Sequence, residues 1–172
     1  MLIYLSLEFF WVDFYLATLL QVRHLWLLNL VISLKLQDHV LFHDEVPQST
    51  LATFLRQTDA LISYSRYETF GCVLIEANAS GIPVIVADIP VNHEIINEGE
   101  NGFFVPAENI SALTGKIVWF AKNYHPTQKE KIALAAHEKY NFSKVGKMFD
   151  DLYDTVAKNS VSVSDIADSA KH

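Results

Sequence analysis

Residues 65–88 have the sequence Ser65-Arg66-Tyr67-Glu68-Thr69-Phe70-Gly71-Cys72-Val73-Leu74-Ile75-Glu76-Ala77-Asn78-Ala79-Ser80-Gly81-Ile82-Pro83-Val84-Ile85-Val86-Ala87-Asp88. The middle of this stretch predicts a helix that starts near Phe70, takes Thr69 as its cap and ends before a glycine and a proline. The β-branched run over 84–87 predicts a strand buried on both faces, and another apolar strand is expected over 60–64. The order strand, helix, strand is typical of a parallel sheet covered by helices.

The remainder of the chain continues this alternation of strands and helices. Further strands are expected over 38–43 and 103–105, and further helices over 50–58, 93–97, 111–123, 127–140 and 142–158. We therefore predict an α/β fold, a Rossmann-like parallel sheet flanked by helices, in a domain that spans residues 35–158. Two flanking segments differ in composition. Residues 1–34 form an atypical, apolar segment expected to be helical, and the Ser-, Asp- and Ala-rich tail 159–172 is expected to be flexible.

Two carboxylates, Glu68 and Glu76, bracket the start of the predicted helix. Helical side chains lean toward the N-terminus, so Glu76 points back at that start, roughly 9 Å away along the axis, which is close to the span from a phosphate to the far edge of its ribose. Backbone amides at a helix start can bind the phosphate. The pattern therefore indicates a ligand in which a phosphate is linked to a sugar. The alternative is a Glu68 that interacts only with the helix dipole and a solvated Glu76.

The stretch resembles the donor-binding domain of the retaining, family-4 glycosyltransferases of the GT-B fold. That family carries a Glu-x7-Glu element within a Ser-x-x-Glu-x-Phe-Gly…Glu-Ala-x-Ala-x-Gly-x-Pro-Val-Ile stretch, and this chain matches it from Ser65 to Ile85. The similarity continues through Glu94-Ile95-Ile96 and through Glu-Asn-Gly-Phe-Phe-Val-Pro at 100–106. Upstream, residues 36–42 resemble the family's strand before the base-binding loop. The resemblance covers about residues 34–158.

The resemblance implies a role for each matching residue. Glu76 would hold the ribose of a nucleotide diphosphate sugar, and Glu68, the candidate catalytic residue, would position hydroxyls of the donor sugar. The amides of Phe70, Gly71 and Cys72 would meet the sugar and the diphosphate. The expected donor-binding residues are Ser65, Thr69, Phe70, Gly71, Cys72, Val73 and Glu76, with residues 43–46 flanking the base. The implied reaction retains the anomeric configuration and passes the sugar to a glycan or lipid-linked acceptor, with no metal and no cofactor.

The chain departs from the family at its N-terminal end. A complete enzyme of this kind has a second Rossmann-like domain that binds the acceptor, and that domain is not found here, nor are the Gly-Arg and Lys signatures that neutralise the diphosphate. The segment 1–34 is interpreted as foreign sequence joined to a truncated half-enzyme, with a helix that caps the core or a membrane-associated segment as alternatives. We expect the chain to be inactive alone. An acceptor-domain partner chain and a homodimer are the two partner arrangements left open.

Composition narrows the remaining function classes. The 172 residues carry 13 Lys and Arg against 20 Asp and Glu, a net charge of −7, which argues against nucleic acid as a partner. The single cysteine excludes an intrachain disulfide and fits a cytoplasmic location, with peripheral attachment to the membrane left open. The seven histidines are scattered, and no Cys/His spacing predicts a metal site. Two alternatives to a transferase remain: a non-catalytic module of the same fold that binds a nucleotide-sugar or a partner, and a relative of sugar-nucleotide epimerases or phosphorylases.

Four other features have two interpretations each. Cys72 is interpreted as a small apolar substitute, with a thiol activated by the helix start as the alternative. His93 is interpreted as a satisfied or exposed histidine, and Arg66 as a solvated loop arginine; the alternatives are contacts to the donor and to a phosphate. The apolar stripe over 142–156 is expected to pack on its own domain, with a partner-binding face as the alternative.

Overall fold

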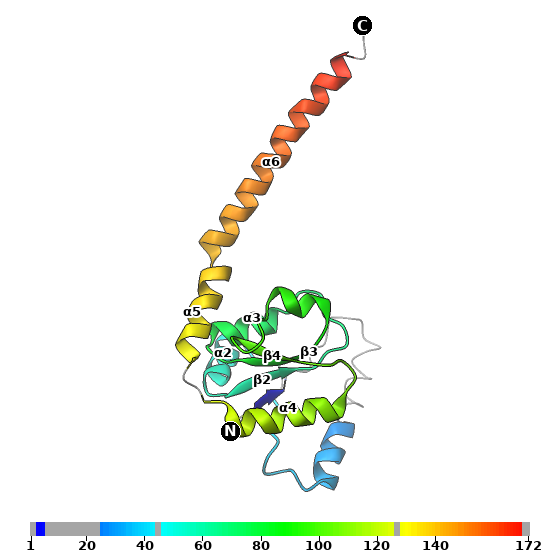
Figure 1. The fold of residues 1–172 in the computed structure, drawn as a ribbon, viewed down its shortest axis with the longest axis vertical. Helices are drawn as coiled ribbons and strands as arrows, with labels where there is room; N and C mark the ends of the chain where they lie inside the picture. The colour runs from blue at the N-terminus through cyan, green and yellow to red at the C-terminus, as the bar shows by residue number, and fades with distance from the viewer. Residues whose placement is uncertain (1–2, 6–24, 44–45, 126–127, 170–172) are drawn as a thin grey trace.

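The computed structural model describes residues 3–5, 25–43, 46–125 and 128–169, and its centre is a parallel β-sheet (Figure 1). The strands are β1 (Ile3–Leu5), β2 (Ala60–Ser63), β3 (Val84–Ala87) and β4 (Gly102–Val105). They lie in the order β1-β2-β3-β4, and each neighbouring pair is parallel. In the register of the central strands, Leu61 lies opposite Val84 and Val84 lies opposite Gly102. The predicted α/β fold is confirmed.

Helices cover both faces of the sheet, as a buried parallel sheet requires. On one face lie α2 (Gln48–Arg56) and α3 (Cys72–Ala79), and on the other lies α4 (Ile110–Asn123) (Figure 1). A short 3-10 helix, η1 (Pro90–Glu94), follows β3, and α5 (Lys129–Tyr140) packs against α3. Residues 25–33 also form a helix, and α6 (Phe142–Ser169) is the last described element.

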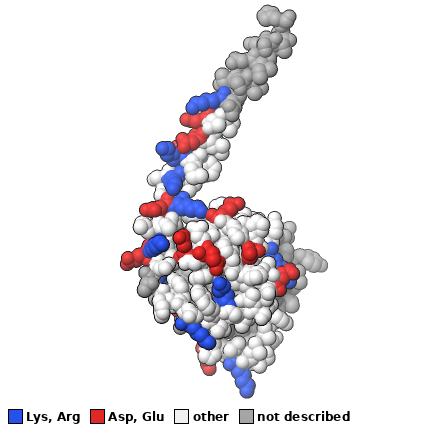
Figure 2. All heavy atoms as spheres, viewed as in Figure 1, with Lys and Arg blue, Asp and Glu red and all other residues white. Residues whose placement is uncertain are grey.

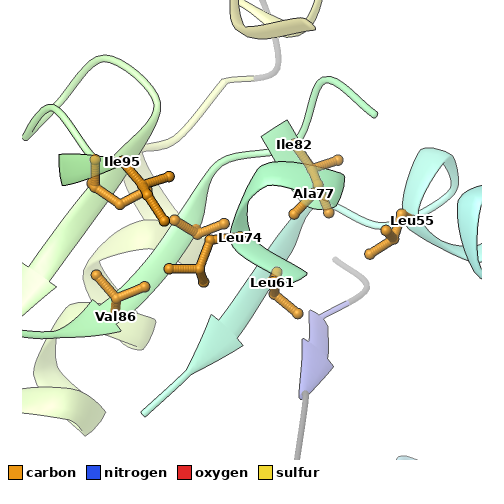
Figure 3. Close-up of a cluster of buried hydrophobic side chains, with 9 residues drawn as sticks. Leu55, Leu61, Leu74, Ala77, Ile82, Val86 and Ile95 are labelled. Carbon is orange, nitrogen blue, oxygen red and sulfur yellow. The ribbon is translucent and has the colours of Figure 1, made fainter. Parts of the chain in front are cut away.

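Two hydrophobic clusters hold the layers together, because alternate residues of each strand point to opposite faces. The cluster under α2 and α3 consists of Leu55, Leu61, Leu74, Ala77, Ile82, Val84, Val86, Ile95 and Ile96 (Figure 3). The cluster under α4 consists of Ala60, Ile62, Ile85, Phe103, Val105 and Phe120. Every residue of β2 and β3 is buried. Burial of each large aliphatic side chain contributes about 1.5–3 kcal/mol, so the clusters fix the strand ends from which the loops emerge.

A network of side-chain amides joins α3 to the turn before β4. Asn78 is 2% exposed, and its Nδ2 donates to the backbone carbonyls of Ile82 and Asn101, each at 3.0 Å. Asn101 Nδ2 donates in return to Asn78 Oδ1 at 2.8 Å and to the Ile95 carbonyl at 3.0 Å. The Asn101 amide therefore satisfies Asn78 Oδ1, and together the two amides donate to three backbone carbonyls. The network fixes the turn between Glu98 and Gly102.

Asn141 separates α5 from α6 and caps both helices. Its backbone is extended, with φ −69° and ψ 151°. Its Oδ1 accepts a hydrogen bond from the Lys144 amide at 2.8 Å, and its Nδ2 donates to the His137 carbonyl at 3.1 Å. One residue thus satisfies backbone groups at the end of one helix and the start of the next. Beyond it, α6 projects away from the sheet and its covering helices (Figure 1).

The two faces of α6 differ in chemistry. Apolar residues recur at intervals of three and four, and apart from the half-buried Val145 they are exposed: Phe142, Val145, Phe149, Leu152 and Val156. Between residues 142 and 158, the charged side chains occupy the other positions, namely Lys144, Lys147, Asp150, Asp151, Asp154 and Lys158. The expectation that this stripe packs on its own domain is wrong, because Phe142 is 98% exposed and Leu152 is 56% exposed. Because α6 projects away from the domain after Asn141, its apolar face is not covered by the domain.

Three expected segments differ from the structure. Residues 38–43 form no strand, because the amides of His39 and Val40 both donate to the Leu36 carbonyl in a local turn. β1 is a strand of the sheet, although it lies within the segment 1–34 that we expected to be helical. α6 extends to Ser169, so the described part of the expected flexible tail is helical.

The apolar N-terminal segment is described only in part. Its helix over 25–33 exposes Leu25 and Trp26, whose exposed fractions are 58% and 61%. Among the described residues, no helix combines the length and the apolar composition that crossing a bilayer requires. The hypothesis of a membrane-associated segment rests largely on residues 6–24, which lie outside the described part of the chain.

Candidate functional site

The loop 64–71 connects β2 to α3 at the carboxyl edge of the sheet. The same edge carries the loops that begin with Asp88 after β3 and with Pro106 after β4. Tyr64 joins two of these loops, because its hydroxyl donates to the Pro106 carbonyl at 2.5 Å and accepts from the Asn109 amide at 2.8 Å. Ligands of open parallel sheets bind outside this edge. The loop therefore lies where a ligand is expected.

Gly71 sets the point at which α3 begins. Its backbone is left-handed, with φ 74° and ψ 39°. The left-handed backbone favours glycine, and an added Cβ atom would lie 2.9 Å from Cδ1 of Ile95 and 3.2 Å from Cδ1 of Leu74, so the ends of these side chains would have to shift. The helix starts at Cys72, and the predicted start near Phe70 with Thr69 as cap is wrong. A left-handed residue at position 71 cannot continue a helix that began earlier.

Glu68 satisfies the amides of the loop. Its Oε1 accepts hydrogen bonds from the backbone amides of Thr69, Phe70 and Gly71 at 2.8, 3.1 and 3.0 Å. A carboxylate in this position stabilises donors that have no helical partner and interacts favourably with the helix dipole. Two of the amides expected to meet a diphosphate, those of Phe70 and Gly71, are directed at Glu68 in this conformation. Glu68 therefore stabilises the conformation of its own loop by accepting hydrogen bonds from three of the loop's backbone amides.

Glu76 is held by a residue of the neighbouring helix. Gln48, the first residue of α2, donates through Nε2 to Glu76 Oε1 at 2.9 Å. Both side chains are at least partly exposed, and α2 and α3 contact each other on the same face of the sheet. The sequence did not point to Gln48, because residues 28 positions apart share no local pattern. The available signal was the succession of two helices on one sheet face, which brings their surfaces together.

The other predicted donor-binding residues lie in the loop after β2 and in the first turn of α3. Ser65 is half-buried in the loop, Thr69 and Phe70 are exposed, and Cys72 carries an exposed free thiol. Val73 instead packs against the cluster under α3. The structure therefore brings the predicted residues into one continuous segment, in which only Val73 turns clearly toward the core. Of the residues expected to flank a base, His43 lies against Phe54 with ring centroids 4.7 Å apart, and residues 44–45 lie outside the described residues.

Two charged residues at this edge are paired within the protein. Arg66 Nε lies 3.3 Å from Glu108 Oε1, and both side chains are largely exposed, which agrees with a solvated loop arginine. Such pairs contribute about 0–1 kcal/mol. His93 Nε2 lies 2.6 Å from Asp88 Oδ1, and its ring stacks on Phe104 with centroids 4.2 Å apart. The interpretation of His93 as a satisfied histidine is confirmed.

The chemistry available at the site consists of hydrogen bonds and carboxylates. Over the face shown in Figure 2, the acidic and basic atoms of the described residues are interspersed. Within the described ranges, no three His, Cys, Asp or Glu side chains are grouped closely enough to hold a metal ion. The absence of a metal requirement stays a prediction. The backbone amides in the first turn of α3, which begins at Cys72, suit an anionic group, and the Gln48–Glu76 pair suits hydroxyl donors.

The fold matches one half of solved GT-B glycosyltransferase structures. A sucrose-phosphate synthase from Thermosynechococcus elongatus superposes with a TM-score of 0.69 and 25% identity, over 77% of this chain and 34% of that one. An Anabaena protein solved in complex with UDP and glucose has the same fold, with a TM-score of 0.68 and 20% identity over 78% of this chain and 37% of that one.

The sequence comparison identifies the family. The chain belongs to the glycosyl transferases group 1 family, whose model matches residues 23–138. A phosphatidyl-myo-inositol mannosyltransferase from Mycobacterium leprae is 30% identical over 132 residues, which are 74% of this chain and 35% of that protein. The chain thus spans about a third of the length of the relatives that it matches.

Proposed function

We propose that the chain binds a nucleotide diphosphate sugar at the carboxyl edge of β2 and serves as the donor-side domain of a retaining glycosyltransferase. Glu76 holds the ribose. Glu68 orders the loop and positions hydroxyls of the donor sugar, and the amides at the start of α3 meet the diphosphate. The observation that supports this best is the hydrogen bond from Gln48 to Glu76 at 2.9 Å, which fixes a carboxylate one turn inside that helix.

The proposed reaction joins an acceptor hydroxyl to the anomeric carbon of the donor sugar. The acceptor belongs to a glycan or a lipid-linked glycan. The bond between the anomeric carbon and the phosphate oxygen breaks, its electron pair stays with the nucleotide diphosphate, and the hydroxyl proton passes to the departing phosphate oxygen. Attack from the face that the nucleotide leaves retains the anomeric configuration. Protein hydrogen-bond donors stabilise the leaving phosphate, so the proposal includes no metal.

Calorimetric titration with UDP, GDP and their glucose and mannose conjugates tests the donor site. We expect saturable binding of at least one of these nucleotides. Glu76→Ala removes a charged hydrogen-bond acceptor, so we expect at least about tenfold weaker binding. The matched control Glu138→Ala removes an exposed glutamate from α5 and should leave the affinity unchanged. If no nucleotide binds, the proposed function is wrong.

A second candidate is a module of the same fold that binds a nucleotide-sugar or a partner but does not catalyse transfer. The open apolar face of α6 supports it, since Phe149 and Leu152 are 55% and 56% exposed. In this version an acceptor-domain chain or a second copy of this chain covers α6. Release of nucleotide diphosphate from a bound donor, with a glycan acceptor present, separates the candidates. Turnover supports the transferase, and binding without turnover supports the module.

A further inference from the structure

The hydrogen bond between Gln48 and Glu76 has a defined direction. A carboxylate oxygen only accepts hydrogen bonds, so the Gln48 amide must present its NH2 group to Glu76 and cannot be reversed. The distance of 2.9 Å between Nε2 and Oε1 is ordinary for such a bond. With the amide nitrogen committed to Glu76 Oε1, Gln48 Oε1 and Glu76 Oε2 remain as the other two acceptor atoms of the hydrogen-bonded pair.

The backbone that carries Gln48 is fixed. The amides of Thr50 and Leu51 both donate to the Pro47 carbonyl, which sets the first turn of α2. Leu55, in the last turn of α2, is 1% exposed and belongs to the cluster under α3. An exposed glutamate otherwise exchanges among several rotamers, and holding it in one costs side-chain entropy. A hydrogen bond from a packed neighbouring helix holds the glutamate in one rotamer before a ligand arrives. Ligand binding then loses less side-chain entropy.

We infer that Gln48 is a positioning residue that holds Glu76 in its ribose-binding rotamer, and that the pair selects ribonucleotides over 2′-deoxyribonucleotides. The inference rests on the proposed function, because it assigns the specificity of the same site. The neighbouring 2′- and 3′-hydroxyls of a ribose are two donors, which match the two remaining acceptors of the pair. A deoxyribose offers one donor and leaves one acceptor without a partner. Sites built to bind a hydroxyl discriminate against ligands that lack it.

The ratio of affinities for ribose and deoxyribose forms of one nucleotide measures this role. We would titrate the full chain with UDP and 2′-deoxy-UDP, and with GDP and 2′-deoxy-GDP, before and after Gln48→Met, which keeps the length of the side chain but removes the amide. Loss of one hydrogen bond predicts about twofold to tenfold weaker binding of the ribonucleotide, with less change for the deoxy form, so the ratio falls. A second variant, Gln48→Glu, places a like charge beside Glu76, and the ratio should fall further.

Matched controls separate this inference from the proposed function. Gln57→Met makes the same substitution at an exposed position that caps the other end of α2, and the ratio should not change. An unchanged ratio in both Gln48 variants, with the wild-type chain binding nucleotide, would overturn the inference and leave the donor site intact. A wild-type chain that binds none of the four nucleotides would overturn both. Because Gln48 is exposed, thermal melting should show the variants folded as well as the wild-type chain.

Discussion

Asn78 and Asn101 bind each other through both side chain and backbone. Asn101 Nδ2 donates to Asn78 Oδ1 at 2.8 Å, and Asn78 Nδ2 donates to the Asn101 carbonyl at 3.0 Å. The pair connects the helix that carries Glu76 to the turn that enters β4. Since Asn78 is 2% exposed, loss of either amide leaves polar atoms without a partner in the interior.

Alanine at either asparagine should therefore destabilise the domain. We expect Asn78→Ala and Asn101→Ala each to lower the free energy of unfolding by about 1–3 kcal/mol, as measured by urea denaturation. The double variant should cost less than the sum, because each single variant already breaks the shared bonds. Asn123→Ala is the control, since its side chain makes an exposed bond to the Trp119 carbonyl, and it should stay within about 0.5 kcal/mol. Strict additivity would contradict a shared network.

Two glycines should respond in opposite ways to alanine. At Gly71 the left-handed backbone opposes a side chain, so Gly71→Ala should destabilise by about 1–2 kcal/mol. Gly115 lies inside α4, where an added Cβ atom has no neighbour within 4 Å among the described residues. Gly115→Ala should stabilise by about 0.5–1 kcal/mol. Thermal unfolding of both variants checks this, and equal shifts of the same sign would show that the backbone at Gly71 is misplaced.

Glu68, rather than Thr69, should account for the stability of the loop before α3. Glu68→Ala removes the acceptor of three amides and should cost about 0.5–2 kcal/mol, the range for loss of a helix cap. Faster hydrogen exchange at Thr69, Phe70 and Gly71 should accompany this loss. Thr69→Ala is the control and should cost less than about 0.5 kcal/mol, because Thr69 is exposed and the N-cap of α3 is Gly71. A larger loss for Thr69→Ala than for Glu68→Ala would reverse the assignment.

The hydroxyl of Tyr124 should make stability depend on alkaline pH. Burial, and secondarily the charge of Asp59, raise the pKa of Tyr124 above its ordinary value. The folded chain therefore keeps this proton at a pH where the unfolded chain, titrating near pH 10, loses it. The stability from this group is fully present below about pH 10 and is lost as the pH rises through the raised pKa. Tyr124→Phe should reduce the alkaline fall in the free energy of unfolding.

The same substitution should not lower stability at neutral pH. The buried Tyr124 hydroxyl has no hydrogen-bond partner among the described residues, while its ring stacks on Phe120 with centroids 4.3 Å apart. Phenylalanine keeps the stacking and removes an unsatisfied polar atom. Urea denaturation at neutral and alkaline pH measures both effects. Tyr67→Phe, at an 83% exposed position, is the control, and a drop in neutral stability for Tyr124→Phe would reveal a missed partner.

The apolar face of α6 should cause the isolated chain to associate with itself. Exposed apolar side chains at intervals of three and four, with charges on the other face, favour pairing of helices. Sedimentation velocity should show a mass that rises with concentration, and the double variant Phe149→Glu/Leu152→Glu should sediment as a monomer. Asp150→Ala/Asp154→Ala changes only the charged face and should not reduce association. A wild-type chain that stays monomeric at high concentration would contradict this prediction.

The sequence predicted the parts of the fold that local patterns determine. The β-branched run of β3 and the apolar run of β2 specify buried strands, and every residue of both strands is buried. The start of α3 was placed too early, because the residue pattern shows neither that Gly71 is left-handed nor that the Glu68 carboxylate accepts from the three amides that follow it. The strand expected over 38–43 does not form, because the amides of His39 and Val40 donate to the Leu36 carbonyl in a turn.

The sequence predicted the residues of the candidate site that are close together along the chain, but not those that only the fold brings together. The sequence located the loop, the helix start and both glutamates, since these lie within a dozen residues of one another. It could not supply Gln48, whose approach to Glu76 depends on how α2 and α3 pack on the sheet. It also gave no reason for α6 to leave the domain, because the periodicity of an apolar stripe is the same whether or not a partner covers it.

The break at Asn141 turns α6 into a lever. A helix of 28 residues is about 42 Å long, so a change of about 10° at this joint moves its far end by about 7 Å. The sheet, its loops and the Gln48–Glu76 pair stay where they are during such a swing. The backbone angles of one residue therefore decide where anything attached to α6 stands relative to the carboxyl edge of β2.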